Sequence, residues 1–578
     1  MLSQWSWIAG RESRLPLVGV ALLMLIALVA AACGGDDPAP PAETAEQPAA
    51  DVSASAEVAA VEEEEEVVLT IAVPAMPLGV DKDYSFGNFQ TFESIGNCYE
   101  AGFNFAKIDY PYDTPPEGQG LQYPDHAGER EPWQLLSAEL AADGQSVVLN
   151  IRPGVISAAG NELTADDVVW SLERAFALEG VGFFYVTLLN LDPEEPATVI
   201  DDYTVRVNAL NPNGLLGRIW DDLYFPFMDS TDAIAHATEE DPWATEYSTT
   251  NCAGFGAYTI ETWTPGQEVV WIPNPNYWGP EPQIDRVIYR VIPDAAVRLA
   301  ALQRGEIDIA QNLSPDQQVQ AGESDGVRAI GVRSDFILFL YTNPEIFEPF
   351  GDVRVRQAIN YVMPRREIAE SVYLGQATPW RAAAATIFPG TNEEFWPYGD
   401  EPDFETARVL MAEAGYADGF DIPLSYTSAF PLWEQVANLV ARNLAEVNIN
   451  VALDPLPDGD FAAQSFERTT IPFGLWLDAP GGSDPVYNLF IYYYDRNVIG
   501  NFSLIEDPEV TAILDEAIKA QTLEDRIAAV QPAHQRVLEN AVFTFLVEPH
   551  YTIAIRDNIE GFVWYAWQNF YFRELRKN

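Results

Sequence analysis

The stretch of sequence that decides the fold runs from Gly254 to Asp308 and carries three short motifs. They are Gly254-Phe255-Gly256-Ala257-Tyr258, then Asn274-Pro275-Asn276-Tyr277-Trp278-Gly279, and then Gly305-Glu306-Ile307-Asp308-Ile309-Ala310. The pattern predicts a glycine-rich turn into a strand, an aromatic turn, a strand at residues 287–291 and a helix at residues 295–304 that ends at Gly305. Such alternation is typical of an α/β fold, and no catalytic residues stand out in it.

The N-terminus carries an apolar run at residues 15–32, preceded by two arginines. Its length suits either a signal peptide or a membrane anchor. The run ends in three alanines followed by Cys33, which resembles a bacterial lipoprotein signal. In that case residues 1–32 are removed and Cys33 carries the lipid, although Ala30 stands where leucine is usual. The alternative is an uncleaved helix with an incidental cysteine. Both place the rest of the chain outside the cytoplasmic membrane.

Residues 34–66 are rich in Pro, Ala, Asp and Glu, with a run of glutamates at residues 62–66. Such a segment buries too little apolar surface to offset its ordering entropy. We therefore expect residues 33–66 to comprise the lipidated cysteine and an acidic, disordered tether. The chain beyond the tether is long enough for two or three lobes, and it contains no second apolar run of membrane-spanning length.

The chain is strongly acidic, with a formal net charge of -57. Phosphate backbones and anionic lipids attract basic surfaces, so we expect no binding to nucleic acid. The histidines form no metal-ligand pattern, and we therefore expect no bound metal and no cofactor. They are His126, His236, His534 and His550.

The sequence contains no pattern of a known catalytic site. Gly-x-Ser-x-Gly, His-Glu-x-x-His and phosphate-cradling loops are all absent from it. The adjacent acids Asp166 and Asp167 could serve a glycosidase, but acids at the start of a helix usually cap it and interact with its dipole. We therefore expect that the protein is not an enzyme.

Two further blocks complete the set of motifs. In the first, Thr164 precedes Ala165-Asp166-Asp167 and an amphipathic helix. In the second, Tyr341-Thr342-Asn343 ends a strand and Val353-Arg354-Val355-Arg356-Gln357-Ala358 begins a helix. Apolar residues at helical spacing also predict a short helix over residues 92–103.

In this order the motifs resemble those of the extracytoplasmic solute-binding proteins of ABC importers, specifically the large peptide/nickel-binding family. That family carries Gly-Thr-Gly-Pro-Tyr, Asn-Pro-x-Tyr-Trp, Gly-x-x-Asp-Ile, Leu-Thr-Ala-x-Asp-Val and Val-Arg-Gln-Ala at the corresponding places. The resemblance covers nearly all of residues 67–578. It implies an α/β, two-lobed, hinged fold of the periplasmic-binding-protein type, of the large class with an extra subdomain and mixed sheets.

The resemblance also implies a division of the chain into lobes. Lobe I would comprise residues 67–105, 226–335 and 541–578, and its extra subdomain residues 106–225. Lobe II would comprise residues 336–540. A solute held between the lobes stabilises the closed form only if it contacts both of them.

The implied function is to capture oligopeptides, or a similar solute, in a cleft between the lobes and to deliver them to the ABC permease subunits. We expect a monomer that its lipid holds at the outer face of the cytoplasmic membrane, in a periplasm or at the cell surface. Members of the family also take oligosaccharides, nickel chelates or haem, and an aromatic cleft suits sugars. A surface adhesion or signalling lipoprotein is an alternative of another class.

The main candidate for a ligand-binding residue is Asp478, in Phe473-Gly474-Leu475-Trp476-Leu477-Asp478. With the following Asp484-Pro485 it resembles Gly-Trp-x-x-Asp then Asp-Pro, from which peptide-binding members take the acid that pairs with the peptide's amino terminus. A carboxylate at a strand end can neutralise a buried ammonium. Because Trp476 is displaced by one place and the turn is longer here, a solvated loop carboxylate is the alternative.

The other candidates have plain structural alternatives. Gly254, Phe255 and Gly256 could line the cleft through their backbone, or form a turn before a strand. Arg381 could meet a ligand carboxylate, or pair with surface acid. The aromatic residues near Asp478 either line the cleft or belong to the core. They are Trp476, Tyr487, Phe490, Tyr492, Tyr493 and Tyr494.

Two cysteines follow Cys33 in the chain, Cys98 and Cys252. The resemblance places both of them in lobe I. In an oxidising compartment they can form a disulfide, whereas two free buried thiols are the alternative, and both possibilities stay open.

Overall fold

The computed structural model describes residues 66–85, 87–112, 121–178, 180–222, 225–399, 401–495, 500–566 and 569–578. The expected signal peptide, Cys33 and all but the last residue of the expected tether lie outside these ranges. No helix within these ranges is long and apolar enough to cross a membrane.

The first large sheet has seven strands, in the order β10, β11, β12, β1, β13, β21 and β14. Strand β1 (Val68–Val73) pairs in parallel with β12 (Arg286–Val291) and β13 (Ile309–Gln311). Every residue of β1 after the first is buried, as expected of a parallel strand that is covered on both faces. The remaining strands are β10 (Tyr258–Thr264), β11 (Glu268–Pro273), β14 (Val327–Val332) and β21 (Tyr551–Arg556).

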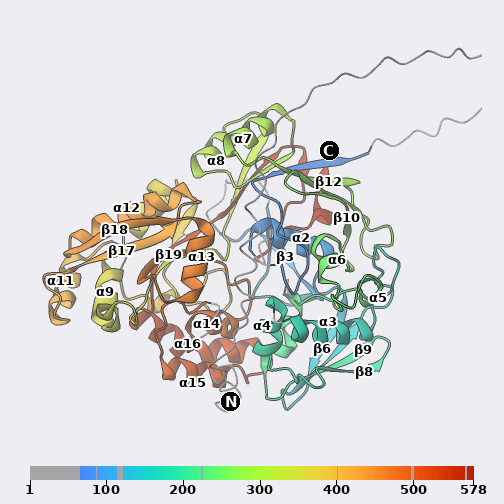
Figure 1. The fold of residues 1–578 in the computed structure, drawn as a ribbon, viewed down its shortest axis with the longest axis horizontal. Coiled ribbons are helices and arrows are strands. Elements are labelled where there is room, and N and C mark those ends of the chain that lie inside the picture. The colour runs from blue at the N-terminus through green and yellow to red at the C-terminus, as the bar shows by residue number, and fades with distance from the viewer. Residues whose placement is uncertain are drawn as a thin grey trace, which may run out of the picture. The chain divides into compact units, whose positions relative to one another are not determined.

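The second large sheet has six strands, in the order β16, β20, β15, β19, β17 and β18. Strand β15 (Ile337–Thr342) is buried throughout and pairs antiparallel with β19 (Phe473–Asp478) and β20 (Phe543–Pro549). Strands β17 (Phe420–Thr427) and β18 (Ile449–Leu456) pair in parallel, so this sheet is mixed as well. Its other strand is β16 (Ala377–Pro379), and its helices include α9 (Val353–Tyr361), α11 (Phe404–Glu413), α12 (Pro431–Ala445) and α13 (Asp458–Glu467). Figure 1 shows these helices grouped with β17, β18 and β19.

A smaller antiparallel sheet, in the order β6, β7, β9 and β8, lies within the segment expected as the extra subdomain. Helix α3 (Ala165–Leu178) lies between β7 and β8 along the chain, and the N–H and the hydroxyl of Thr164 donate to the Asp167 carboxylate at 2.8 Å and 3.1 Å. The strands are β6 (Leu135–Leu140), β7 (Ser146–Ile151), β8 (Ala197–Asp201) and β9 (Thr204–Asn208).

Further helices and short strands connect these sheets. The helices are α2 (Phe89–Tyr99), α4 (Val181–Leu188), α5 (Ser230–Ala235), α6 (Thr245–Thr250), α7 (Ala295–Arg304), α8 (Pro315–Gly322), α10 (Arg365–Glu367), α14 (Pro485–Tyr493), α15 (Pro508–Ala517) and α16 (Leu523–Glu539). The strands are β2 (Phe103–Phe105), β3 (Lys107–Asp109), β4 (Gln122–Pro124), β5 (Arg130–Pro132), β22 (Ile559–Glu560) and β23 (Arg576–Lys577).

The predicted strand and helix after the deciding turns are present as β12 and α7, and Gly305 ends the helix with a φ of 74°. The helix predicted over residues 92–103 is wrong at its C-terminal end. Helix α2 ends at Tyr99, because Glu100 takes a positive φ of 57° and Phe103 already begins β2.

The chain crosses between the two large sheets at two places that lie side by side. Strand β14 continues into β15 through residues 333–336, and β20 continues into β21 through His550. The Ser334 hydroxyl donates to the carbonyl of Pro549 at 2.8 Å. Arg333 pairs with Glu548 at 2.9 Å. The fold is therefore a mixed α/β fold with two lobes, joined by two linked crossings of the kind that serve as a hinge.

The expected lobe boundaries can be set beside these crossings. The boundary after residue 335 falls within the first crossing. The boundary before residue 541 precedes β20, which belongs to the second sheet. We therefore propose His550 as the boundary at that place, and the division into lobes and subdomain stays a proposal.

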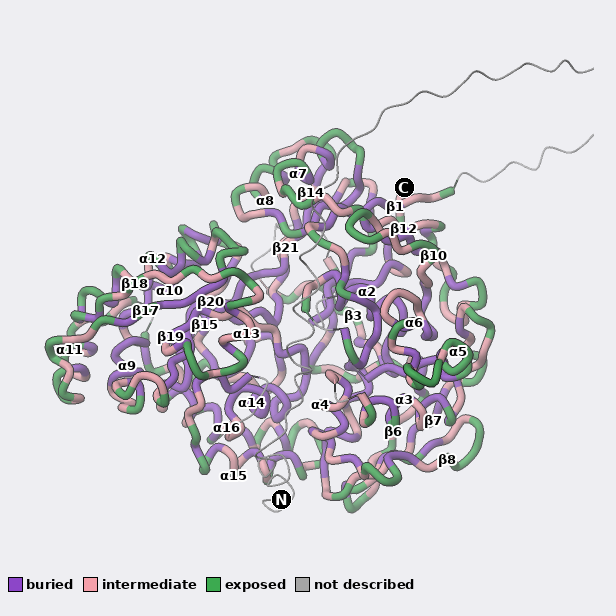
Figure 2. The backbone as a smooth tube through the Cα atoms, in the orientation of Figure 1, coloured by how far each residue is buried: buried purple, intermediate pink, exposed green. Residues whose placement is uncertain are grey.

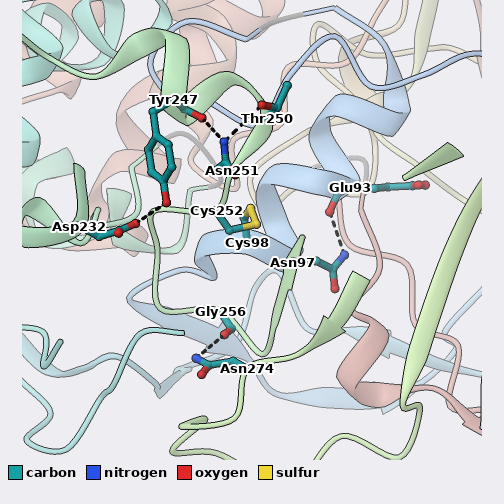
Figure 3. The surroundings of a disulfide bond; sticks show 10 residues. All are labelled: Glu93, Asn97, Cys98, Asp232, Tyr247, Thr250, Asn251, Cys252, Gly256 and Asn274. Carbon is teal, nitrogen blue, oxygen red and sulfur yellow. Dashed lines mark hydrogen bonds between the residues drawn. A yellow bond between two sulfur atoms is a disulfide. The ribbon is translucent and has the colours of Figure 1, made fainter. Parts of the chain in front are cut away.

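The deciding segment packs against the C-terminal end of α2. The N–H of Gly256 donates to the carbonyl of Cys98 at 2.9 Å, and the N–H of Asn274 donates to the carbonyl of Ala257 at 2.8 Å. The Asn274 side chain also donates to the carbonyl of Gly256 at 3.1 Å (Figure 3). Hydrogen bonds thus join the first two motifs to each other and join the first motif to the C-terminal end of α2.

The two cysteines lie at this same place and are joined. Cys98 and Cys252 form a disulfide with their Cα atoms 5.3 Å apart, across a sequence separation of 154 (Figure 3). The structure therefore favours the disulfide over two free thiols. It ties the end of α2 to the residues just before the glycine-rich turn.

Removal of the disulfide should destabilise the protein. We expect the double variant Cys98→Ser/Cys252→Ser to lose about 2–5 kcal/mol of unfolding free energy, because the unfolded chain is no longer constrained by a long loop. Urea unfolding followed by circular dichroism measures the loss. Adding a reducing agent should weaken the wild type and leave the double variant unchanged; equal stability of the two proteins without reductant would contradict the disulfide.

The glycine at position 256 should tolerate no side chain. A Cβ there would lie 2.3 Å from the carbonyl oxygen of Asn97 and 2.6 Å from that of Cys98. Because both are backbone atoms, Gly256→Ala should cost at least about 1–3 kcal/mol in urea unfolding. Gly351→Ala is the matched control, since nothing lies within 4 Å of the added atom there, and it should change stability little.

Candidate functional site

Asp478 is the last residue of β19 and lies directly opposite Ile337 of β15. The residue is half-buried, and its carboxylate accepts a hydrogen bond from the N–H of Ala479 at 2.8 Å. Burial raises the pKa of Asp478 to about 6, whereas the Ala479 N–H and the nearby Tyr492 and Trp476 lower it. Among the described residues, no lysine or arginine contributes to this pKa, so the carboxylate has no protein counter-ion there.

Helix α14 begins just after the turn that follows Asp478. Every one of its residues is buried, and Figure 2 draws the helix accordingly. Burial on every face shows that α14 lies inside the protein and not on its surface. Its Tyr487 hydroxyl lies 3.1 Å from the hydroxyl of Tyr185 on α4, and the two rings are stacked with centroids 6.3 Å apart. This pair joins the second lobe to the expected extra subdomain.

Several polar atoms of β19 and α14 are buried without a hydrogen-bond partner among the described residues. They are the indole nitrogen of Trp476, the hydroxyl of Tyr492 and both side-chain polar atoms of Asn488. Trp476 and Tyr492 lie close enough to Asp478 to lower its pKa, but their geometry is not that of an ordinary hydrogen bond. Asn488 and Tyr492 share one face of α14, since they are four residues apart. Buried polar atoms of this kind are commonly satisfied by water or by a bound ligand.

The aromatic surroundings of Trp476 are the sort that can line a binding site. Its ring centroid lies 5.5 Å from that of Phe461, 5.8 Å from that of Phe466 and 4.7 Å from that of Phe502. Trp476 itself remains half-buried. The structure thus brings four of the predicted residues together, namely Asp478, Trp476, Tyr487 and Tyr492.

The other predicted residues lie elsewhere. The turn of Gly254, Phe255 and Gly256 packs against α2 in the first lobe, and Phe255 is fully buried. Close contact with a helix backbone accounts for both glycines without a ligand, so their binding role stays a prediction.

Arg381 is half-buried on the loop directly after β16. It is not among the groups that shift the pKa of Asp478, and its role as a ligand contact also stays a prediction. A pocket lined by residues that include Lys82, Ser171 and Phe227 contains none of the predicted residues.

Sequence reasoning missed two residues of the site, Asp335 and Tyr185. Asp335 lies in the first crossing between the sheets and is fully buried. A lone acid between two strand-like runs is a weak signal, and it does not reveal that the carboxylate lies close to Asp478. Tyr185 carries no such signal, because only the contact of its hydroxyl with that of Tyr487 brings it to this place.

The arrangement is one for binding. No group of His, Cys, Asp or Glu among the described residues could hold a metal ion. Two lobes, a double crossing, and a half-buried carboxylate near buried unpaired polar atoms are features that suit a solute-binding protein. The chain belongs to the bacterial extracellular solute-binding proteins, family 5, because the family model described as "family 5 Middle" matches residues 129–499.

Similar proteins agree with this membership. The chain is 24% identical over 438 residues to the probable D,D-dipeptide-binding periplasmic protein DdpA of Escherichia coli, covering 74% of this chain and 81% of that protein. It is 24% identical over 465 residues to heme-binding protein A of Haemophilus influenzae, covering 75% and 81%. The solved structure of the periplasmic binding protein DppA of Helicobacter pylori, in complex with the peptide STSA, superimposes with a TM-score of 0.74 at 20% identity, over 88% of this chain and 98% of that one. This last likeness bears on the fold.

Proposed function

We propose that this protein is a lipid-anchored solute-binding protein that captures oligopeptides, or a similar solute with a free amino group, and delivers them to an ABC importer. The observation that carries the proposal is Asp478, a carboxylate at a strand end with no cation beside it among the described residues. A buried charge without a partner is costly. A ligand ammonium would supply that partner through a charge-assisted hydrogen bond.

The hinge and the tyrosine pair suggest how a solute is enclosed. Tyr185 and Tyr487 meet across the two lobes at a hydroxyl separation of 3.1 Å. We propose that this contact opens when the lobes separate at the Arg333 and Glu548 crossings, and that it re-forms or is bridged by the solute on closure. A ligand that contacts both lobes shifts the equilibrium towards the closed form by its differential affinity.

The anchoring and the partners are part of the same proposal. Residues 1–32 would be removed as a signal, Cys33 would carry the lipid, and residues 34–66 would act as the tether. The folded body would then work as a monomer at the outer face of the cytoplasmic membrane, where it meets the permease subunits. Binding, with no catalysis, is the role that the described site supports.

Native mass spectrometry of the full chain, extracted in mild detergent, tests the proposal. We expect co-purified short peptides in the wild type and their loss in Asp478→Asn, because the amide cannot neutralise an ammonium. Asp460→Asn, an acid on the exposed start of α13, is the control and should retain the peptides. The intact mass also reports whether Cys33 carries a lipid.

The other outcomes have distinct meanings. A bound sugar, haem or nickel chelate would keep the importer role and discard the peptide assignment. A protein that stays empty against broad solute libraries would favour a surface adhesion or signalling lipoprotein.

A further inference from the structure

A second carboxylate, that of Asp335, lies beside Asp478. Asp335 is fully buried in the crossing between β14 and β15. One of its oxygens accepts a hydrogen bond from the N–H of Gly481 at 3.0 Å. Its other oxygen, Oδ1, has no hydrogen-bond partner among the described residues. One half of this carboxylate is therefore unsatisfied inside the protein.

The turn after β19 brings Asp335 and Asp478 close to each other. Asp335 lies in the bend just before β15, whose first residue, Ile337, lies directly opposite Asp478. The N–H that Asp335 accepts belongs to Gly481, three residues after Asp478. Burial raises the pKa of Asp335 well above its usual range, and the negative charge of Asp478 raises it further.

The groups that face this pair from the surrounding elements are acids and tyrosines. Tyr487 and Tyr492 of α14 interact electrostatically with both carboxylates, and Asp222 acts on Tyr487 from the other lobe. No lysine or arginine among the described residues contributes to the pKa of Asp335 or of Asp478.

The nearest cations along the chain are engaged elsewhere. Arg333, two residues before Asp335, pairs with Glu548 at 2.9 Å. Arg526 pairs with Asp484, the residue before α14, at 2.8 Å. The site therefore holds one buried and one half-buried carboxylate and no described protein cation to balance them.

We propose that Asp335 is a second ligand-binding carboxylate, and that the solute carries two positive charges, one for Asp335 and one for Asp478. This inference rests on the proposed function and names its ligand class, a peptide that begins with a basic residue or a compact diamine. A ligand with a single ammonium would engage one carboxylate and leave Oδ1 of Asp335 buried without a hydrogen-bond partner, which is the costly arrangement for a polar atom.

The charge state of Asp335 links binding to pH. In the empty protein burial raises the pKa of Asp335 and so favours its protonated form, whereas a ligand cation favours the ionised form. Binding of a dication therefore releases a proton, and the affinity rises with pH between the pKa of the complex and that of the empty protein. A monocation that is held by Asp478 alone would release fewer protons.

Isothermal titration calorimetry on the full chain in mild detergent tests the inference with two dipeptides of equal size. Lysyl-alanine carries the second ammonium, and norleucyl-alanine lacks it. We expect wild type to bind lysyl-alanine at least about tenfold more tightly, the scale of one well-placed charge pair. Titrations in buffers of different ionisation enthalpy should show more protons released by lysyl-alanine.

The variants assign the effect to residues. Asp335→Asn should abolish the preference, so that the ratio of the two affinities falls to about one, because the amide removes the second charge. Asp478→Asn should weaken both dipeptides, and Asp460→Asn should change neither. Thermal unfolding of each variant checks that it folds, and the proton release of the wild type is a readout that needs no variant.

The outcomes separate this inference from the proposed function. If norleucyl-alanine binds in an Asp478-dependent way and lysyl-alanine binds no better, the second carboxylate is not a ligand group and the peptide function stands. If neither dipeptide binds but 1,4-diaminobutane does, with loss in Asp335→Asn, the dication inference stands and the peptide assignment falls. If none of the three binds, both fall.

Discussion

The carboxylate of Glu100 holds together segments from opposite ends of the chain. It accepts hydrogen bonds from the hydroxyl of Tyr277 at 3.0 Å and from the N–H of Ala257 at 3.3 Å, and it pairs with Arg573 at 3.2 Å. The indole N–H of Trp133 donates to it as well. A positive φ at a non-glycine residue costs about 1–3 kcal/mol and persists only where its surroundings hold it. Glu100 is held in this way at the end of α2, and both turns of the deciding segment depend on where that helix stops.

Local patterns in the sequence predict those elements whose ends have local causes. Helix α7 could be placed to the residue, since Asp294 caps its start and Gly305 ends it. Helix α2 could not, because its end is set by Glu100, whose partners are distant in sequence. The apolar spacing continues past Tyr99, but the contacts that stop the helix come from other parts of the fold.

In the candidate site, too, the features that could be predicted are local in sequence, and the others depend on distant contacts. Asp478 could be predicted, because a strand end and a following turn are local features. Asp335 could not, because its burial and its closeness to Asp478 come from the pairing of β15 with β19. The glycines at 254 and 256 were expected either to line the cleft or to form a turn before a strand, and the neighbour that approaches them in the structure is α2. The sequence pattern indicates that glycine is needed at these positions, but it does not reveal which part of the protein packs against them.

The crossings between the lobes and the site are one continuous piece of chain. Arg333 and Ser334 bind the second crossing, and Asp335 follows them directly. A change of backbone angle in this segment therefore moves the Asp335 carboxylate together with the hinge. Charge in the site and the angle between the lobes are coupled through adjacent residues, with no need for a longer pathway.

The disulfide also affects how the protein responds to proteolysis. Cys98 and Cys252 are separated by 154 positions, and the loop that they close contains the whole of residues 106–225. Surface loops are the usual sites of proteolytic cutting. One cut anywhere within this loop leaves both resulting fragments covalently attached, so a nicked protein keeps its two lobes in a single particle. A single proteolytic cut between Cys98 and Cys252 therefore cannot release the subdomain from the rest of the protein.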